Sequence, residues 1–310
     1  MCDVKQRKFN SVLPILTLLF VFNSYSCADT EFVDEKLKVL HDKTFPISAG
    51  NDLKLDASLG DIVVTSWNKN EVHVKILGNE KAKEKVEFRF NDSEDLIEIE
   101  AKYDWSLFMS LKGVRLRFEI QVPKEFNLNV NTSGGDIKLQ NVNGKIISKT
   151  SGGDINLTEL NGNIEVSTSG GNITFNNSYG DLNLSTSGGD IKGNKFSGKL
   201  EVLTSGGDIS LAGQDSRING STSGGDISLD YSGQNQGIEL STSGGDIAVK
   251  IPKDFNASAN MSTLGGNIKC DLAVNNAVKI SSDKFEADIN NGGNSLILKT
   301  SGGDITVKKK

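Results

Sequence analysis

A hexapeptide that returns at a fixed interval limits this chain to repeat folds. Thr-Ser-Gly-Gly-Asp-Ile occurs seven times, and near-copies begin at Thr168 and Thr263. From Thr132 to Thr222 the interval is always 18 residues. A short fixed period is the signature of an architecture in which each repeat packs against its two neighbours. The seven copies begin at Thr132, Thr150, Thr186, Thr204, Thr222, Thr242 and Thr300.

Within each repeat, glycines return at half that interval. The series begins at Gly135, Gly144 and Gly153, and an apolar residue follows each of these glycines by two positions. Apolar and polar residues then alternate, which is typical of a short strand with one buried face. The sequence therefore predicts an all-β fold, a β-solenoid of the parallel β-helix or β-roll kind, with two short strands in each 18-residue turn.

Side-chain parity along these strands places the residues of the hexapeptide. The threonines share the inward parity of Ile146 and Ile164, so we expect them to be buried at a corner. The aspartates have outward parity. The same count puts Cys270 in the column of Leu139 and Leu157, where it should be a buried thiol that packs as a small apolar side chain.

Four segments follow from these patterns. Residues 1–26 are an export signal, 27–44 a polar tether, 45–131 an N-terminal β-rich region that caps the solenoid, and 132–310 the β-solenoid repeats. The N-terminal region holds a degenerate repeat at Gly60-Asp61, a helical turn at 80–86 and a hairpin across 91–95. The irregular stretch 252–294 should close the other end, because a bare solenoid end exposes an unpaired strand edge.

The first residues are typical of an exported protein. Three basic residues precede an apolar run at 12–22, which is too short for a stable membrane span. Cys27 follows Ser24-Tyr25-Ser26, which resembles the lipobox of bacterial lipoproteins, in which the cysteine is acylated. The same residues also fit an ordinary signal-peptidase site, so a lipid-anchored and a simply secreted protein both stay open.

The charge of the chain excludes one class of partner. Formal net charge is −6, and removal of residues 1–26 leaves 31 basic and 39 acidic residues, or −8. Phosphate backbones would repel such a chain, so we expect no nucleic-acid partner.

One family resembles this chain over residues 45–310. The hexapeptide repeat, Gly-Asp-Ile-Val-Val at 60–64, Val-Pro-Lys-Glu-Phe-Asn at 122–127 and the lipoprotein-like N-terminus carry the resemblance. The family consists of bacterial putative adhesins with β-strand repeats, otherwise of unknown function. The resemblance implies the solenoid fold and an adhesin-like role, and no catalytic residues transfer from it.

The aspartate column is the first candidate site. Neighbouring carboxylates about 5 Å apart repel one another by roughly 1 kcal/mol in water, so something must offset that repulsion. Either each carboxylate accepts hydrogen bonds from N–H groups of its turn, or the column binds a cation such as Ca²⁺. The Gly-x-Asp ligands of the calcium-binding nonapeptide are missing here. The column consists of Asp136, Asp154, Asp190, Asp208, Asp226 and Asp246, interrupted by Asn172.

Two further surfaces could contact a partner. The loop at 105–111 is strongly apolar and either contacts a partner or membrane surface, or covers the solenoid end. Its apolar residues are Trp105, Leu107, Phe108, Met109 and Leu111. The outward repeat positions are small and polar and suit broad, weak, repeated contacts. They include Lys138, Asn156, Thr174, Lys192, Ser210 and Ser228.

These observations favour a non-enzymatic binding or scaffold protein of the bacterial cell envelope, an adhesin held by an acyl anchor at Cys27 on the outer membrane or cell surface. Its ligand would be a protein or a glycan. The alternatives are a periplasmic or secreted location, a periplasmic envelope-stress or assembly scaffold, and a polysaccharide-active enzyme. No cofactor, metal-spaced cluster or recognisable nucleophile arrangement is expected.

Overall fold

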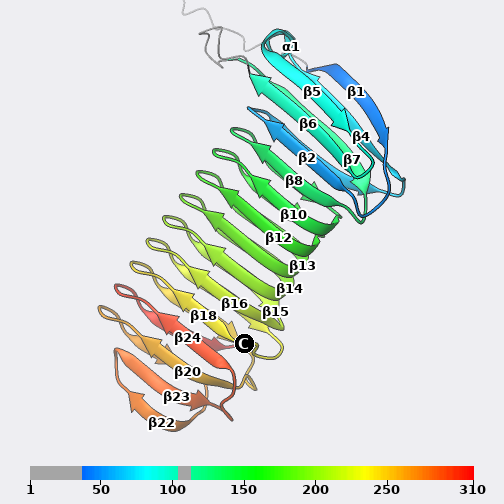
Figure 1. The fold of residues 1–310 in the computed structure, drawn as a ribbon. Coiled ribbons are helices and arrows are strands. Elements are labelled where there is room, and N and C mark those ends of the chain that lie inside the picture. Colours follow the sequence, from blue (N-terminus) through cyan, green and yellow to red (C-terminus); the bar gives the residue numbers. More distant parts are fainter. Residues whose placement is uncertain (1–36, 104–112) are drawn as a thin grey trace, which may run out of the picture. The chain divides into compact units, whose positions relative to one another are not determined.

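The structure is a computed structural model that describes residues 37–103 and 113–310. All of the described residues belong to one unit, residues 36–310. Within that unit the strands form a β-solenoid, as the repeats predict. Each turn contributes a strand to each of two ladders, and strands of successive turns pair in parallel along both ladders (Figure 1).

The first ladder contains the strands that precede the hexapeptide corner. In spatial order they are β5 (Val86–Asp92), β6 (Leu96–Tyr103), β2 (Asp52–Ala57), β8 (Asn127–Thr132), β10 (Asn143–Lys149), β12 (Asn161–Thr168), the second halves of β13 (Ile173–Thr186) and β14 (Ile191–Leu203), β16 (Ser216–Ser221), β18 (Ile238–Ser241), β24 (Ser295–Lys299), β20 (Ala257–Ser262), β23 (Lys284–Ile289) and β22 (Val274–Ile280).

The second ladder contains the strands that follow the corner. In order they are β1 (Lys38–Pro46), β4 (Glu71–Gly78), β7 (Leu116–Pro123), β3 (Asp61–Trp67), β9 (Ile137–Gln140), β11 (Ile155–Thr158), the first halves of β13 and β14, β15 (Ile209–Gln214), β17 (Ile227–Ser232), β19 (Ile247–Ile251), β25 (Ile305–Lys309) and β21 (Ile268–Cys270).

Parallel register puts like residues above one another, turn after turn. Ile137, Ile155, Ile173 and Ile191 pair in sequence along the second ladder, and all four are fully buried. The hexapeptide threonines are between 1% and 6% exposed, which confirms their predicted inward position. Branched apolar columns of this kind form one continuous core between the ladders.

Glycines that interrupt the apolar columns make room for large side chains of the neighbouring turn. A Cβ atom at Gly193 would lie 2.1 Å from the Phe175 ring, and one at Gly213 would lie 2.4 Å from the Phe196 ring. The two rings pack with centroids 5.5 Å apart. The gap in the sequence pattern at Gly193 is therefore filled in space by Phe175.

Spatial order departs from chain order at both ends of the stack. Figure 1 shows β2 between β6 and β8, and β24 between β18 and β20. The degenerate repeat at 60–64 therefore forms a full turn, with Ile62 paired to Ile137. The final hexapeptide of the chain, at Thr300, likewise lies inside the stack rather than at its end.

Antiparallel strands close both ends. At the N-terminal end β1 and β5 pair with β4 and β6, and the predicted hairpin across 91–95 is confirmed. The predicted helical turn is α1 (Glu80–Lys85), which Asn79 caps through its side chain. Strand β1 occupies 38–44 of the expected tether. At the C-terminal end β23 pairs with β20 and β22 pairs with β23, so this part of the irregular stretch covers the end as expected.

Cys270 lies in the predicted column but is only half-buried. It pairs with Val307, which continues the column of Val249 and Leu229. Strand β21 is the last of its ladder, so no further turn covers the thiol. The expectation of full burial is therefore wrong, although burial still raises the pKa of the thiol.

We expect substitution of Gly189 to destabilise the solenoid much more than substitution of Gly188. A Cβ atom at Gly189 would lie 2.0 Å from the Gly171 carbonyl oxygen, whereas one at Gly188 has no heavy atom closer than 3.7 Å. Gly189→Ala should lower the free energy of unfolding by at least about 2 kcal/mol, and Gly188→Ala should change it by no more than about 0.5 kcal/mol. Urea unfolding of both variants measures this, and equal losses would contradict the predicted close approach.

His41 should make the N-terminal end sensitive to acid. Burial, and secondarily Lys43, lower the pKa of His41 from its ordinary value of 6.5. The unfolded chain then binds more protons than the folded chain below that value, so stability should fall as pH drops through about 6.5. Melting temperatures between about pH 7.5 and about pH 5.5 test this. His41→Gln should flatten the profile, and parallel profiles for the two proteins would refute the assignment.

Candidate interaction surfaces

The hexapeptide corner is held together by hydrogen bonds between turns. Each threonine hydroxyl donates to a glycine carbonyl of the neighbouring turn, as Thr186 does to Gly171 at 2.9 Å. From Thr150 onward each hydroxyl also accepts from the N–H of the second glycine of its own turn, as Thr186 does from Gly189 at 3.2 Å. The same pattern recurs along the stack. The threonine column is therefore a structural seam with no free hydroxyl donor.

The aspartate column points outward, as predicted, and forms a second seam. Each carboxylate accepts the backbone N–H of the equivalent residue in the next turn, and Asn172 takes part through its amide oxygen, which accepts from Asp190 at 2.8 Å. Nine such bonds of 2.7–3.0 Å run without a break from Asp61 to Asn267. The hydrogen bonds thus join turns, whereas the sequence indicated bonds within a turn.

These bonds offset the repulsion between stacked carboxylates by placing an N–H donor against every one of them. Among the residues that the structure describes, no group of three or more His, Cys, Asp or Glu side chains is arranged to hold a metal ion. The cation at this column remains a prediction that calcium titration can test.

Two of the predicted sites lie outside the described residues. These are the lipidation site, Cys27, and the apolar loop of Trp105, Leu107, Phe108, Met109 and Leu111. In the described part of the chain, no helix is both long and apolar enough to cross a membrane.

The outward column of the second ladder is exposed as predicted, except for the half-buried Thr174. Its residues follow one another in register from Lys138 to Ser228. A shallow depression of about 500 Å³ lies over this ladder, with Ser210 and Ser228 among its lining and Lys192 and Lys250 beside them. Ser228 donates to Ser210 at 3.1 Å, so these two hydroxyls on the floor of the depression already bond to one another.

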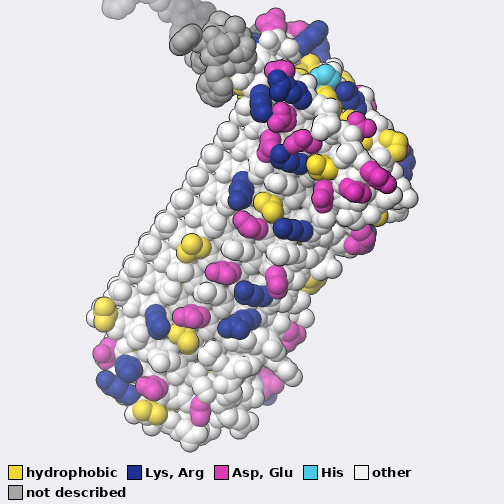
Figure 2. Space-filling view, in the orientation of Figure 1, with side chains coloured by type: hydrophobic (Ala, Val, Ile, Leu, Met, Phe, Trp, Pro, Cys, Tyr) yellow, Lys and Arg dark blue, Asp and Glu magenta, His cyan; other side chains and the backbone are white. Residues whose placement is uncertain are grey.

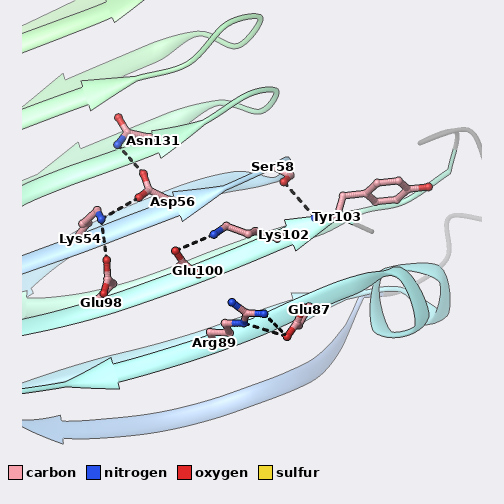
Figure 3. Close-up of polar contacts among 10 residues, drawn as sticks. All are labelled: Lys54, Asp56, Ser58, Glu87, Arg89, Glu98, Glu100, Lys102, Tyr103 and Asn131. Carbon is pink, nitrogen blue, oxygen red and sulfur yellow. Dashed lines mark hydrogen bonds and ion pairs between the residues drawn. The ribbon is translucent and has the colours of Figure 1, made fainter. Parts of the chain in front are cut away.

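The face of the first ladder changes character along the stack. Figure 2 shows charged side chains gathered over the N-terminal strands and more widely spaced along the repeats. At the N-terminal end they are paired. Lys54 lies 2.7 Å from Glu98 and 3.4 Å from Asp56, and Asn131 donates to Asp56 at 2.9 Å (Figure 3).

The pairing is reflected in the pKa values. The hydrogen bond between Lys54 and Glu98 raises the pKa of the lysine and lowers that of the glutamate. Such solvent-exposed pairs are screened by water and salt, so they contribute little to stability. They neutralise this part of the face rather than form a site.

Further along the first ladder an unforeseen row of side chains faces solvent. It alternates between glutamate and asparagine over five turns, and we call it the carboxylate–amide row. The sequence pattern indicated outward columns on the second ladder only. An 18-residue offset within the sequence relates the first four members and could have revealed them. The row consists of Glu165, Asn183, Glu201, Asn219 and Glu239.

A depression of about 500 Å³ adjoins the row at its C-terminal end. Gly237 follows Lys199 and Arg217 in the neighbouring outward column, and Ser295 follows Gly237. The missing side chain at Gly237 leaves a hollow, which Arg217 and Glu239 border. This surface therefore places hydrogen-bond donors and acceptors beside an open depression.

Family comparison agrees with the fold. A family model described as Toastrack DUF4097 matches residues 50–308. The chain belongs to the Toastrack DUF4097 family. No curated protein sequence matches it significantly.

Solved structures similar to this Toastrack chain include two putative adhesins and a putative lipid binding protein. A putative adhesin from Bacteroides fragilis is 16% identical, with a TM-score of 0.44 over 88% of this chain and 97% of that one. A putative adhesin from Parabacteroides distasonis is 13% identical, with a TM-score of 0.46 over 89% and 98%. A putative lipid binding protein from the same species is 12% identical, with a TM-score of 0.30 over 87% and 96%.

Substitutions at Asp190 should separate hydrogen bonding from cation binding in the aspartate column. Asp190→Ala removes the acceptor for the Asp208 N–H and should cost about 1–2 kcal/mol in urea unfolding. Asp190→Asn should cost less than about 0.5 kcal/mol, because Asn172 already fills the same role with an amide oxygen.

Melting temperatures measured with Ca²⁺ test the alternative, that the aspartate column binds a cation. If the column binds Ca²⁺, millimolar Ca²⁺ would raise the melting temperature of the parent chain, and Asp190→Asn would reduce that rise. If the carboxylates serve only the seam between turns, neither Ca²⁺ nor a chelator shifts the melting temperature of either protein.

Proposed function

We propose that this chain is an exported, lipid-anchored binding protein of the bacterial cell envelope, an adhesin whose solenoid faces contact a protein or glycan. The export signal and the Cys27 anchor come from the sequence pattern. The adhesin role comes from the family resemblance. The structure supports a binding role, because exposed polar side chains lie in register on the outward columns of both ladders.

One observation carries the proposal. The corner side chains are engaged in bonds between turns, whereas the outward columns of both ladders keep exposed polar groups in strict register over many turns. Such a surface repeats one pattern of donors and acceptors at the strand spacing, about 4.8 Å. A partner with its own repeat, or several copies of one partner, can make many weak contacts there at once.

A stiff scaffold strengthens this reading. The inter-turn seams and the continuous core hold the outward columns in place, so little conformational freedom is lost when a partner binds. The outward columns are polar, so they are better suited to contact with solvent and a ligand than to packing against a second hydrophobic core.

Protease treatment of intact cells tests exposure. We expect added protease to remove the chain from the surface of whole cells while a periplasmic marker stays intact. Full protection of the chain would overturn the adhesin proposal and favour a periplasmic scaffold.

The anchor has its own test. Cys27→Ser should abolish incorporation of labelled fatty acid and release the chain from the membrane fraction, and Cys270→Ser is the matched control that should change neither. A parent chain that carries no acyl group would refute the anchor and favour cleavage by an ordinary signal peptidase.

A further inference from the structure

The spacing within the carboxylate–amide row is its most informative property. Glu165 pairs in register with Asn183, Asn183 with Glu201, Glu201 with Asn219, and Asn219 with Glu239. Chemically equivalent groups are therefore two turns apart, or about 9.6 Å at a strand spacing of about 4.8 Å. This repeat is close to the length of a disaccharide unit in an extended β-linked glycan, in which every second sugar presents the same face.

The members of the row are available to a ligand. All five side chains are exposed. Glu165 forms only a 3.5 Å ion pair with Lys149, and the other four have no hydrogen-bond or ionic partner within the described residues. The Lys54, Asp56 and Glu98 cluster on the same ladder, by contrast, is paired.

The flanks of the row supply the other contacts that a sugar chain uses. Leu203 stands 53% exposed beside Glu201, in an outward column whose neighbours are Ser185 and Ser221. An isolated leucine there offers an apolar contact to the C–H face of a sugar ring. On the other flank, Arg217 adds donors beside the hollow at Gly237.

We propose that the carboxylate–amide row, with Leu203 and Arg217 on its flanks, binds an extended, uncharged β-linked glycan that runs across the strands. Sugar hydroxyls donate to the glutamates and accept from the asparagine amides and from the Arg217 guanidinium. The assignment rests on the proposed binding function and names the ligand class and the face that takes it.

Charge decides between neutral and acidic glycans. The row carries three carboxylates, and the chain after residue 26 carries a net charge of −8. A polyuronate would meet repulsion from both, whereas a neutral chain meets only hydrogen-bonding groups. We therefore expect uncharged glycans to bind more tightly than acidic ones.

The first experiment measures binding of the purified chain to neutral β-linked oligosaccharides by titration calorimetry. Probes are cellulose-type and chitin-type oligomers from the dimer to the hexamer, with an acidic oligouronate of equal length for comparison. We expect affinity to increase with length until the oligomer spans the row, and the oligouronate to bind more weakly. Absence of binding to every neutral oligomer would overturn the proposal.

Variants then test the row itself. Glu201→Gln with Glu239→Gln, and separately Leu203→Ser, should weaken the hexamer about tenfold or more. Leu203→Ser introduces the serine that its column neighbours already have, so the fold should not suffer. The control is Glu84→Gln with Glu94→Gln, which removes the same charge from exposed positions outside the row and should leave affinity unchanged.

A swap of two residues tests the spacing. Glu201→Asn with Asn219→Glu keeps the composition and net charge but destroys the two-turn repeat. Loss of hexamer affinity at an unchanged melting temperature supports the proposal. If the swapped chain binds like the parent, the alternation only keeps carboxylates apart and the proposal fails.

These outcomes are separate from those of the proposed function. A chain that protease removes from intact cells but that binds no neutral oligomer would remain a surface protein with another ligand. A chain that binds oligomers but is fully protected in cells would keep the glycan site and lose the adhesin role.

Discussion

The approach of successive turns at the second glycine of each hexapeptide governs the rest of the structure. At Gly189 even one added methyl group would lie 2.0 Å from the carbonyl oxygen of Gly171. The same close contact recurs at the corresponding glycines along the stack. Because the backbones meet there, the threonine hydroxyls and aspartate carboxylates reach the neighbouring turn and form two unbroken seams. The repetition of the hexapeptide is therefore explained by stacking.

That constraint also determines where a ligand can bind. The corner has its donors and acceptors engaged between turns, and the interior is filled by apolar columns. Exposed polar groups remain on the outward columns of the ladders, where the residue identity is free to vary because each side chain contacts only solvent and its column neighbours. On the first ladder this freedom produces the alternation of Glu201 and Asn219, a pattern that stacking by itself does not require.

Much of the fold could be predicted, and the candidate site only in part. Strand parity correctly placed Ile137 and Ile155 inside, the threonines inside and Asp154 outside. Side chains alternate along a strand, so each one can point only to the buried face or to the solvent face. Side-chain parity does not reveal that Cys270 lies on a terminal strand and stays half-exposed. It also left the carboxylate–amide row unnoticed, since outward positions carry no burial signal and Glu239 falls 20 rather than 18 residues after Asn219.

The sequence by itself determined the repeating unit: its length, its two strands, its inward and outward faces and its glycine corner. These are local consequences of side-chain alternation and of close backbone contact. Only the tertiary structure decided the order of the turns. The turns at 52–67 and 295–309 lie inside the stack, and antiparallel strands cover the ends, because an exposed ladder edge must find a partner. Which turn supplies that partner depends on contacts between distant segments, and no single repeat encodes it.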